Sequence, residues 1–99
     1  ITNKDGWSPL IIAAFNGNLD LCRILISLGA NINQPNCNGT TPLMYALSSN
    51  VSENKFLIAK LLIENGALIG VVDMFGLAAI DYARKNDDDG VINFIKEFK

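Results

Sequence analysis

Asp5-Gly6-Trp7-Ser8-Pro9-Leu10-Ile11-Ile12-Ala13 and Asn38-Gly39-Thr40-Thr41-Pro42-Leu43-Met44-Tyr45-Ala46 are two versions of one pattern. Glycine, serine or threonine, proline, leucine and alanine recur at a spacing of 33 residues, from Gly6 to Gly39. A fixed period of this length predicts stacked supersecondary units, because one such unit cannot bury its apolar face alone.

The rest of the chain continues the pattern with one insertion. Ile24–Ala30 matches Leu61–Ala67 at a spacing of 37, so the second unit carries four extra residues, which fall in the polar stretch 48–54. A third unit starts at Gly76, where Ala78-Ala79 replaces Ser-Pro. The chain is therefore predicted to be a single domain over residues 1–99, with units at roughly 3–35, 36–72 and 73–98.

Residues typical of helix ends mark each predicted helix pair. Ser8 and Thr41 suit the N-cap of the first helix, and the proline after each suits the first helical position. Gly29 and Gly66 suit the left-handed position after the second helix. The second helix of the first unit has an apolar face at i, i+3, i+4 and i+7, formed by Leu21, Ile24, Leu25 and Leu28. We expect stacking to bury that face in an α-helical solenoid, with extended loops projecting from one edge.

Composition excludes several classes of protein. The chain has 99 residues, of which 49% are hydrophobic and 18% charged, with a net charge of −2 and a pI of about 4.8. Lysine and arginine form no cluster, which argues against binding to nucleic acid or to an anionic membrane surface. The longest apolar run, Leu10–Phe15, is too short to span a bilayer.

The two cysteines and the N-terminus bear on the cellular setting. Cys22 is interpreted as a small buried hydrophobe and Cys37 as a loop thiol, as in a protein from a reducing compartment. The chain starts without a signal-peptide pattern and without an initiator methionine. We therefore expect a cytoplasmic protein, with the nucleus as an alternative, and a piece of a longer chain.

The sequence predicts no enzyme activity. It contains no histidine, so Ser-His and Cys-His nucleophile pairs are excluded, and two cysteines cannot form a His/Cys zinc site. The glycines stand at the ends of repeat elements and not in a phosphate-binding loop. We expect no cofactor and no metal.

Together these residues resemble the ankyrin repeat, whose signature is Gly-x-Thr-Pro-Leu-His-x-Ala-Ala followed by an apolar helix ending Leu-Leu-x-x-Gly-Ala-Asp-Val-Asn. The resemblance implies an all-α ankyrin-repeat solenoid of stacked helix-turn-helix units with projecting β-hairpin-like loops. Two departures stand out. The signature histidine is replaced in the three units by Ile11, Met44 and Asp81. The third unit resembles a degenerate C-terminal cap made polar by Asp81, Arg84, Lys85 and Lys96.

The resemblance also implies that the chain binds a protein partner, of unknown identity, as a monomer. Family contacts are made by loop tips, which correspond here to Lys4, Asp5, Trp7, Asn38, Thr40, Met74, Phe75 and Leu77. They are also made by the concave face of the first helices, which corresponds to Ile12, Phe15, Tyr45, Ser48, Tyr82 and Lys85.

Alternatives stay open at several of these positions. Trp7 either contacts a partner or packs over its own helix, and Phe75 either contacts a partner or covers the junction between the second and third units. The stretch 48–54 is either an extra recognition loop or a tolerated insertion. For the whole chain, the alternative function is a structural spacer or capping segment of a longer solenoid.

Overall fold

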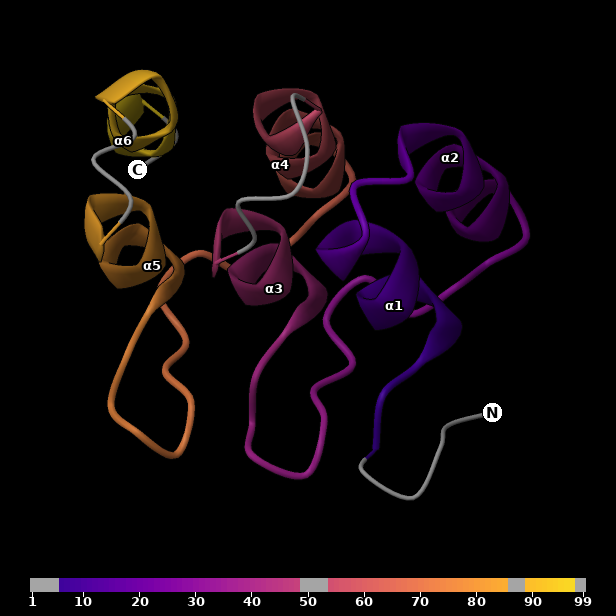
Figure 1. Cartoon of the computed structure of the whole chain (residues 1–99), viewed down its shortest axis with the longest axis horizontal. Coiled ribbons are helices and arrows are strands. Elements are labelled where there is room, and N and C mark those ends of the chain that lie inside the picture. The colour runs from indigo at the N-terminus through magenta and orange to yellow at the C-terminus, as the bar shows by residue number, and fades with distance from the viewer. Residues whose placement is uncertain (1–5, 49–53, 86–88, 98–99) are drawn as a thin grey trace.

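The computed structural model describes residues 6–48, 54–85 and 89–97, and these form three helix pairs side by side (Figure 1). The helices are α1 (Pro9–Phe15), α2 (Leu19–Ser27), α3 (Pro42–Ser48), α4 (Lys55–Glu64), α5 (Ala79–Lys85) and α6 (Asp89–Glu97). One layer holds α1, α3 and α5, the other holds α2, α4 and α6, and the loops project beyond the first layer. The described residues include no β-strand, and the predicted all-α solenoid with projecting loops is confirmed.

Side chains at the helix starts act as the sequence predicts. The Ser8 hydroxyl accepts a hydrogen bond from the Ile11 N–H at 3.2 Å, and the Thr41 hydroxyl accepts one from the Met44 N–H at 3.3 Å. Each bond satisfies a backbone donor that lacks a partner inside the first turn of its helix. A proline stands at the first position of α1 and of α3, where no N–H is needed.

Three further helix ends include two that confirm a prediction and one with a cap that the sequence analysis missed. Gly29 and Gly66 follow α2 and α4 with φ of 91° and 99°, so both take the predicted left-handed conformation. Helix α5 has lost the Ser/Thr-Pro start. Instead, the Asp81 carboxylate accepts a hydrogen bond from the Ala78 N–H at 2.8 Å, which caps the helix from within its first turn.

One apolar core runs through all three helix pairs. The helices of the first layer contribute Leu10, Leu43 and Ala83 to this core, among others, and those of the second layer contribute Cys22 and Ile95. Cys22 is 0% exposed, and burial raises the pKa of its thiol to about 11, so it stays protonated. The prediction that Cys22 is a buried hydrophobe is confirmed, and Cys37 lies exposed in a loop as expected.

The apolar face predicted for α2 does not lie in the core. Leu21, Ile24 and Leu28 are 37%, 53% and 77% exposed, whereas Cys22 faces the core and Leu25 packs partly against it. The expectation that stacking buries all four predicted residues is wrong for a physical reason. Helix α2 lies at one end of the stack, so it has α4 on one side and, among the described residues, no helix on the other, which leaves Leu21 open where the equivalent Ile58 is buried (Figure 1). The position of Leu28 lies outside the core in the second pair as well, where Asn65 is exposed.

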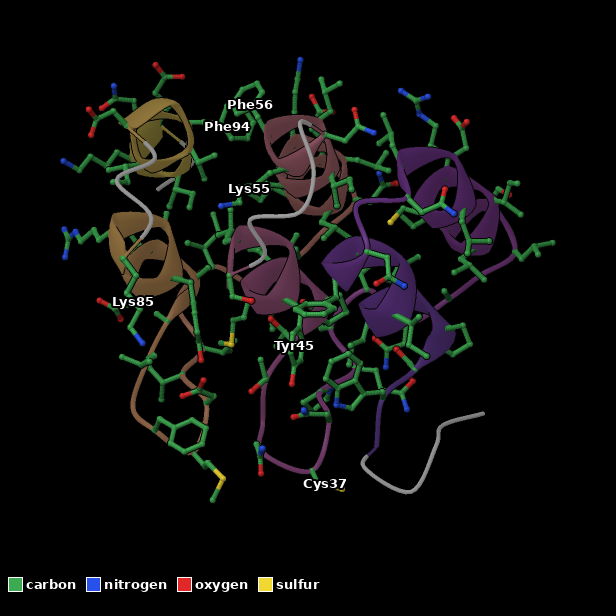
Figure 2. All side chains as sticks on the ribbon, in the orientation of Figure 1. Cys37, Tyr45, Lys55, Phe56, Lys85 and Phe94 are labelled. Atoms are coloured by element: carbon green, nitrogen blue, oxygen red, sulfur yellow. The ribbon has the colours of Figure 1, made fainter. Side chains whose placement is uncertain are left out.

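Bonds between neighbouring pairs hold the stack in register. Asn33 donates from its side-chain amide to the Gly66 carbonyl at 3.1 Å, and its side-chain oxygen accepts from the Leu68 N–H at 2.8 Å. In the second layer, the Phe56 ring of α4 and the Phe94 ring of α6 meet edge to face with centroids 5.5 Å apart (Figure 2). The four extra residues of the second unit fall between the end of α3 and the start of α4. Residues 49–53 of this connection lie outside the described part of the chain.

Candidate protein-binding surface

The loop that precedes α3 is held closed by a buried asparagine. Asn36 is 7% exposed, and its side-chain oxygen accepts hydrogen bonds from the N–H groups of Asn38 at 2.9 Å and Thr40 at 3.0 Å. The Asn36 N–H donates to the Thr40 carbonyl at 3.0 Å, which closes a hairpin-like tip. We call residues 36–40 the second loop.

The loop that precedes α5 repeats this construction with an aspartate. Asp73 is 5% exposed, and one carboxylate oxygen accepts from the N–H groups of Phe75 at 2.9 Å and Leu77 at 3.0 Å. The Asp73 N–H donates to the Leu77 carbonyl at 3.0 Å. We call residues 73–77 the third loop. A backbone closed in this way holds its tip residues in one arrangement before any partner binds.

A tyrosine ties each loop to the helix that follows it. In the second loop, the Asn36 amide donates to the Tyr45 hydroxyl oxygen at 2.7 Å. In the third loop, the direction is reversed, because the Tyr82 hydroxyl donates to the second carboxylate oxygen of Asp73. Both tyrosines were predicted to face a partner, and the structure shows that each braces a loop.

The third loop has a charge that the second lacks. Burial alone would raise the pKa of Asp73, but hydrogen bonds from Tyr82, Leu77 and Phe75 outweigh it and hold that pKa below the ordinary 3.8. Burial, together with the hydrogen bond to Asp73 and its negative charge, raises the pKa of Tyr82. At neutral pH the pair is therefore a carboxylate accepting from a neutral phenol.

The loops contact one another. The Met74 N–H donates to the Asn38 carbonyl at 2.8 Å, which joins the third loop to the second. Cys37 lies at the tip of the second loop (Figure 2), and a Cβ added to Gly6 would meet its backbone nitrogen at 2.8 Å. The projecting loops thus form one continuous edge of the molecule.

Three aromatic rings meet between the first two helix pairs. The Trp7 ring lies 5.5 Å from Phe15 and 4.5 Å from Tyr45, and the latter two are 5.9 Å apart, all measured between centroids. Trp7 therefore packs against its own helix, as one interpretation held, and also against α3. All three side chains are half-buried, so each keeps part of its surface open.

The third loop presents the most exposed of the large apolar residues among the predicted contacts. Met74 is 67% exposed and Phe75 is 64% exposed, so Phe75 does not cover the junction between the second and third pairs. Two further predicted residues, Asn38 and Lys85, are exposed as well. The Lys85 ammonium nitrogen lies 5.6 Å from the centre of the Tyr82 ring, within range of a cation–π contact.

The remaining predicted contact residues are less accessible or not described. Thr40 is 6% exposed and offers a partner little surface, whereas Ile12 is 39% exposed. Leu77 and Ser48 are half-buried, and the Ser48 hydroxyl donates to the Tyr45 carbonyl at 3.1 Å. The predictions for Lys4 and Asp5 lie outside the described residues.

Sequence reasoning missed the two residues that organise this surface, Asn36 and Asp73. A signal was available, since each stands nine residues before a tyrosine, Tyr45 or Tyr82. An Asx residue at a turn commonly accepts hydrogen bonds from backbone N–H groups two residues on, which is the bond seen here.

The described residues contain no group of three or more His, Cys, Asp or Glu side chains placed to hold a metal ion. No helix in the described ranges is long and apolar enough to cross a membrane. What the surface does present is exposed apolar and aromatic side chains on braced loops, an arrangement suited to contact with another macromolecule.

Comparison with known proteins agrees with this architecture. The sequence profile of the family described as ankyrin repeats (3 copies) matches residues 1–73. Human ARF GTPase-activating protein GIT1 is 40% identical over 87 residues, which are 86% of this chain and 11% of that protein. An ankyrin repeat-containing protein of Treponema pallidum (strain Nichols) is 32% identical over 88 residues, 89% of this chain and 28% of that protein.

A shorter match covers 48% of this chain. Human fibronectin type 3 and ankyrin repeat domains protein 1 is 42% identical over 48 residues, 14% of its length. The chain thus spans a small part of each relative, and the shared part is the repeat segment. By its helix pairs, its loops and these matches, the chain belongs to the ankyrin repeat family, whose repeats are generally protein-interaction modules.

Proposed function

We propose that this chain binds a protein partner through the third loop and the adjoining concave face of the first-layer helices. The observation that carries the proposal is the exposure of Met74 and Phe75, 67% and 64%, on a loop that is otherwise closed by hydrogen bonds. Large apolar side chains held in water at a fixed position are typical of binding hot spots.

The bracing of the third loop supports this function energetically. A mobile loop loses conformational entropy when it binds, and that loss reduces affinity. Asp73 fixes the backbone at Phe75 and Leu77, and Tyr82 fixes Asp73. Most of the ordering is therefore complete before the partner arrives.

The concave face extends the same surface. Exposed Lys85 lies over the Tyr82 ring, and Ile12 and the open parts of Phe15 and Tyr45 continue the surface across the first two helix pairs. Aromatic side chains on rigid helices contribute large contact area at little cost in side-chain entropy. We propose that the partner covers Met74 and Phe75 at its centre and reaches toward this face.

The experiment compares two baits in a pull-down from cells that express the protein. One bait carries Met74→Ser and Phe75→Ser. The matched control carries Ile24→Ser and Leu57→Ser, which remove two exposed apolar side chains, 53% and 46% exposed, from the second helix layer. Circular dichroism first verifies that both baits are folded.

We expect the wild-type chain and the control to retain a common partner that the Met74 and Phe75 variant loses by at least tenfold, because two central hot-spot side chains contribute about 1.4 kcal/mol or more. Equal retention by both variants would reject the third loop as the binding site. Equal loss from both would show that the capture is unspecific hydrophobic adsorption.

A further inference from the structure

The tips of the second and third loops occupy the same positions of the repeat but carry different side chains. Cys37 and Asn38 stand at these positions in the second loop, Met74 and Phe75 stand at them in the third, and all four are exposed. Their exposure therefore belongs to the position in the repeat and not to the place of the loop in the stack. The third loop differs because it presents two large apolar side chains there, which gives a partner an apolar anchor point.

Charged side chains on this side of the molecule are unevenly exposed. Helices α1 and α3 and the second loop contain no charged residue, whereas the stretch 68–85 contains Asp73, Asp81, Arg84 and Lys85. Arg84 and Lys85 are exposed, but Asp73 is buried and Asp81 is half-buried. The two bases are thus more open to solvent than the two acids, although the whole chain has a net charge of −2.

The chain's own donors occupy both of these acids. One carboxylate oxygen of Asp73 accepts from two backbone N–H groups of its loop, and the other accepts from the Tyr82 hydroxyl. The Asp81 carboxylate accepts from the Ala78 N–H at 2.8 Å. Neither carboxylate forms an ion pair with Lys85, which lies instead over the Tyr82 ring.

Lys85 lies on the side of the molecule where the third loop projects. Its ammonium nitrogen is 5.6 Å from the centre of the Tyr82 ring, and Tyr82 donates to Asp73 at the base of the loop. The Lys85 side chain points from α5 toward the side on which the loops project (Figure 2). The same position holds Phe15 in the first helix pair and Ser48 in the second, so Lys85 is a charge that the third pair adds to the concave face.

We propose that the protein segment bound at the third loop is acidic: one of its apolar side chains packs against Met74 and Phe75, and a carboxylate a few residues away pairs with Lys85. This inference rests on the proposed function and adds the chemistry of the partner. Attraction between Lys85 and an acidic segment favours both the encounter and the orientation of the bound segment. A basic side chain at the same place would meet like charge beside the apolar anchor, which disfavours basic partners.

Nucleic acid is also acidic but matches this surface less well. Its affinity comes from several lysine and arginine side chains along the phosphate backbone, and the described loops and first-layer helices offer only Arg84 and Lys85. The apolar side chains of Met74 and Phe75 are complementary to aliphatic or aromatic side chains, which a protein segment supplies.

The test selects peptides from a phage-displayed library of random short sequences, with the 99-residue chain as bait. Counter-selection on the variant Met74→Ser with Phe75→Ser removes peptides that bind elsewhere. We expect the remaining peptides to combine a large apolar residue with an excess of Asp and Glu over the unselected library. In fluorescence anisotropy with single selected peptides, Lys85→Gln should weaken binding about threefold and Lys85→Glu about tenfold.

The matched control is Lys60→Glu, which makes the same change in net charge at an exposed position of α4 in the second layer. It should leave the affinity unchanged within about twofold, because Lys60 lies on the other layer and exposed charges are screened by salt over about 10 Å. Circular dichroism verifies that each variant is folded, and Lys85→Gln carries the test if Lys85→Glu is not.

Three outcomes would overturn the inference. Selected peptides without an excess of acid, or an equal effect of Lys85→Glu and Lys60→Glu, would reject the acidic partner and leave the proposed function standing. Absence of any peptide that depends on Met74 and Phe75 would reject the third loop itself. A fluorescent single-stranded oligonucleotide that requires Lys85 but neither Met74 nor Phe75 would make nucleic acid the ligand.

Discussion

The second and third loops share one architecture but differ in the charge at its centre. In both, a buried Asx side chain closes the loop and is tied to a tyrosine nine residues later. Asn36 is neutral and donates to Tyr45, whereas Asp73 is ionised and accepts from Tyr82. Hydrogen bonds to a charged acceptor are worth roughly twice those between neutral groups, so the third loop should be the more strongly braced and the only one of the two whose bracing responds to pH.

The largest effect is expected from removing the two central side chains. Asp73→Ala leaves the Tyr82 hydroxyl and the N–H groups of Phe75 and Leu77 without their acceptor, and should lower the free energy of unfolding by about 3 kcal/mol. Asn36→Ala removes neutral bonds only and should cost about 2 kcal/mol. Urea unfolding followed by circular dichroism measures both. A loss from Asn36→Ala that equals or exceeds the loss from Asp73→Ala would contradict the assigned charge difference.

A glycine pair tests how tightly the loops are packed against their neighbours. Gly6 and Gly76 have φ of 79° and 76°, so alanine at either position costs about 1 kcal/mol for the left-handed backbone alone. A Cβ at Gly6 would meet the Cys37 nitrogen at 2.8 Å, whereas a Cβ at Gly76 would meet nothing within 4 Å. We expect Gly6→Ala to lose about 2–3 kcal/mol in total and Gly76→Ala about 1 kcal/mol. Equal losses in urea unfolding would show that the second loop is not packed against Gly6.

Substitutions at the two tyrosines remove the hydrogen bond between each loop and its helix without touching the bonds inside the loop. Tyr82→Phe removes the donor to the Asp73 carboxylate and should cost about 2 kcal/mol, whereas Tyr45→Phe removes the neutral acceptor of Asn36 and should cost about 1 kcal/mol. The rings stay in place, so packing is preserved in both variants. Thermal unfolding of the two proteins provides the comparison, and a larger drop in Tm for Tyr45→Phe would reverse the proposed order.

The accuracy of the sequence predictions depended on whether the deciding interaction was local. The caps at Ser8 and Thr41 and the left-handed Gly29 and Gly66 were predicted because each depends on residues within one turn. The exposure of Leu21 was not predicted, because the periodicity indicates that a helix has an apolar face but not whether a neighbouring helix covers it.

The candidate site shows the same limit. The place of Met74 and Phe75 at a loop tip could be predicted from the repeat register, whereas the exposure of Phe75 was left open and is decided by the structure. The ties between Asn36 and Tyr45 and between Asp73 and Tyr82 were not predicted, because the nine-residue spacing alone does not show that each loop folds back onto the helix after it. Tyr45 and Tyr82, which were predicted only to contact a partner, thus have a structural role. Alanine at either position would remove both the surface for a partner and the support of the loop, so a loss of binding could not be assigned to one of them. Phenylalanine is the better probe at both positions.

The smallest effect, and the sharpest test of the comparison, is the pH dependence of the third loop. The pKa of Asp73 is lower in the folded chain than its ordinary 3.8, so its contribution to stability is fully present above that value and is lost as pH falls below it. The pKa of Tyr82 is raised above 10.0, so the stability from its neutral hydroxyl is present below that value and is lost as pH rises further. Asn36 has no charge to gain or lose.

Asp73→Asn places in the third loop the neutral amide that the second loop has. It should remove the contribution of Asp73 to the loss of stability at acid pH. We expect the urea midpoint of the wild-type chain to fall more steeply between about pH 5 and about pH 3 than that of Asp73→Asn, because only the wild type takes up a proton at this site on unfolding. Other carboxylates contribute equally to both proteins, so the difference between the two curves isolates Asp73. Parallel curves would mean that Asp73 is not stabilised as a carboxylate, and the two loops would then differ in sequence but not in electrostatics.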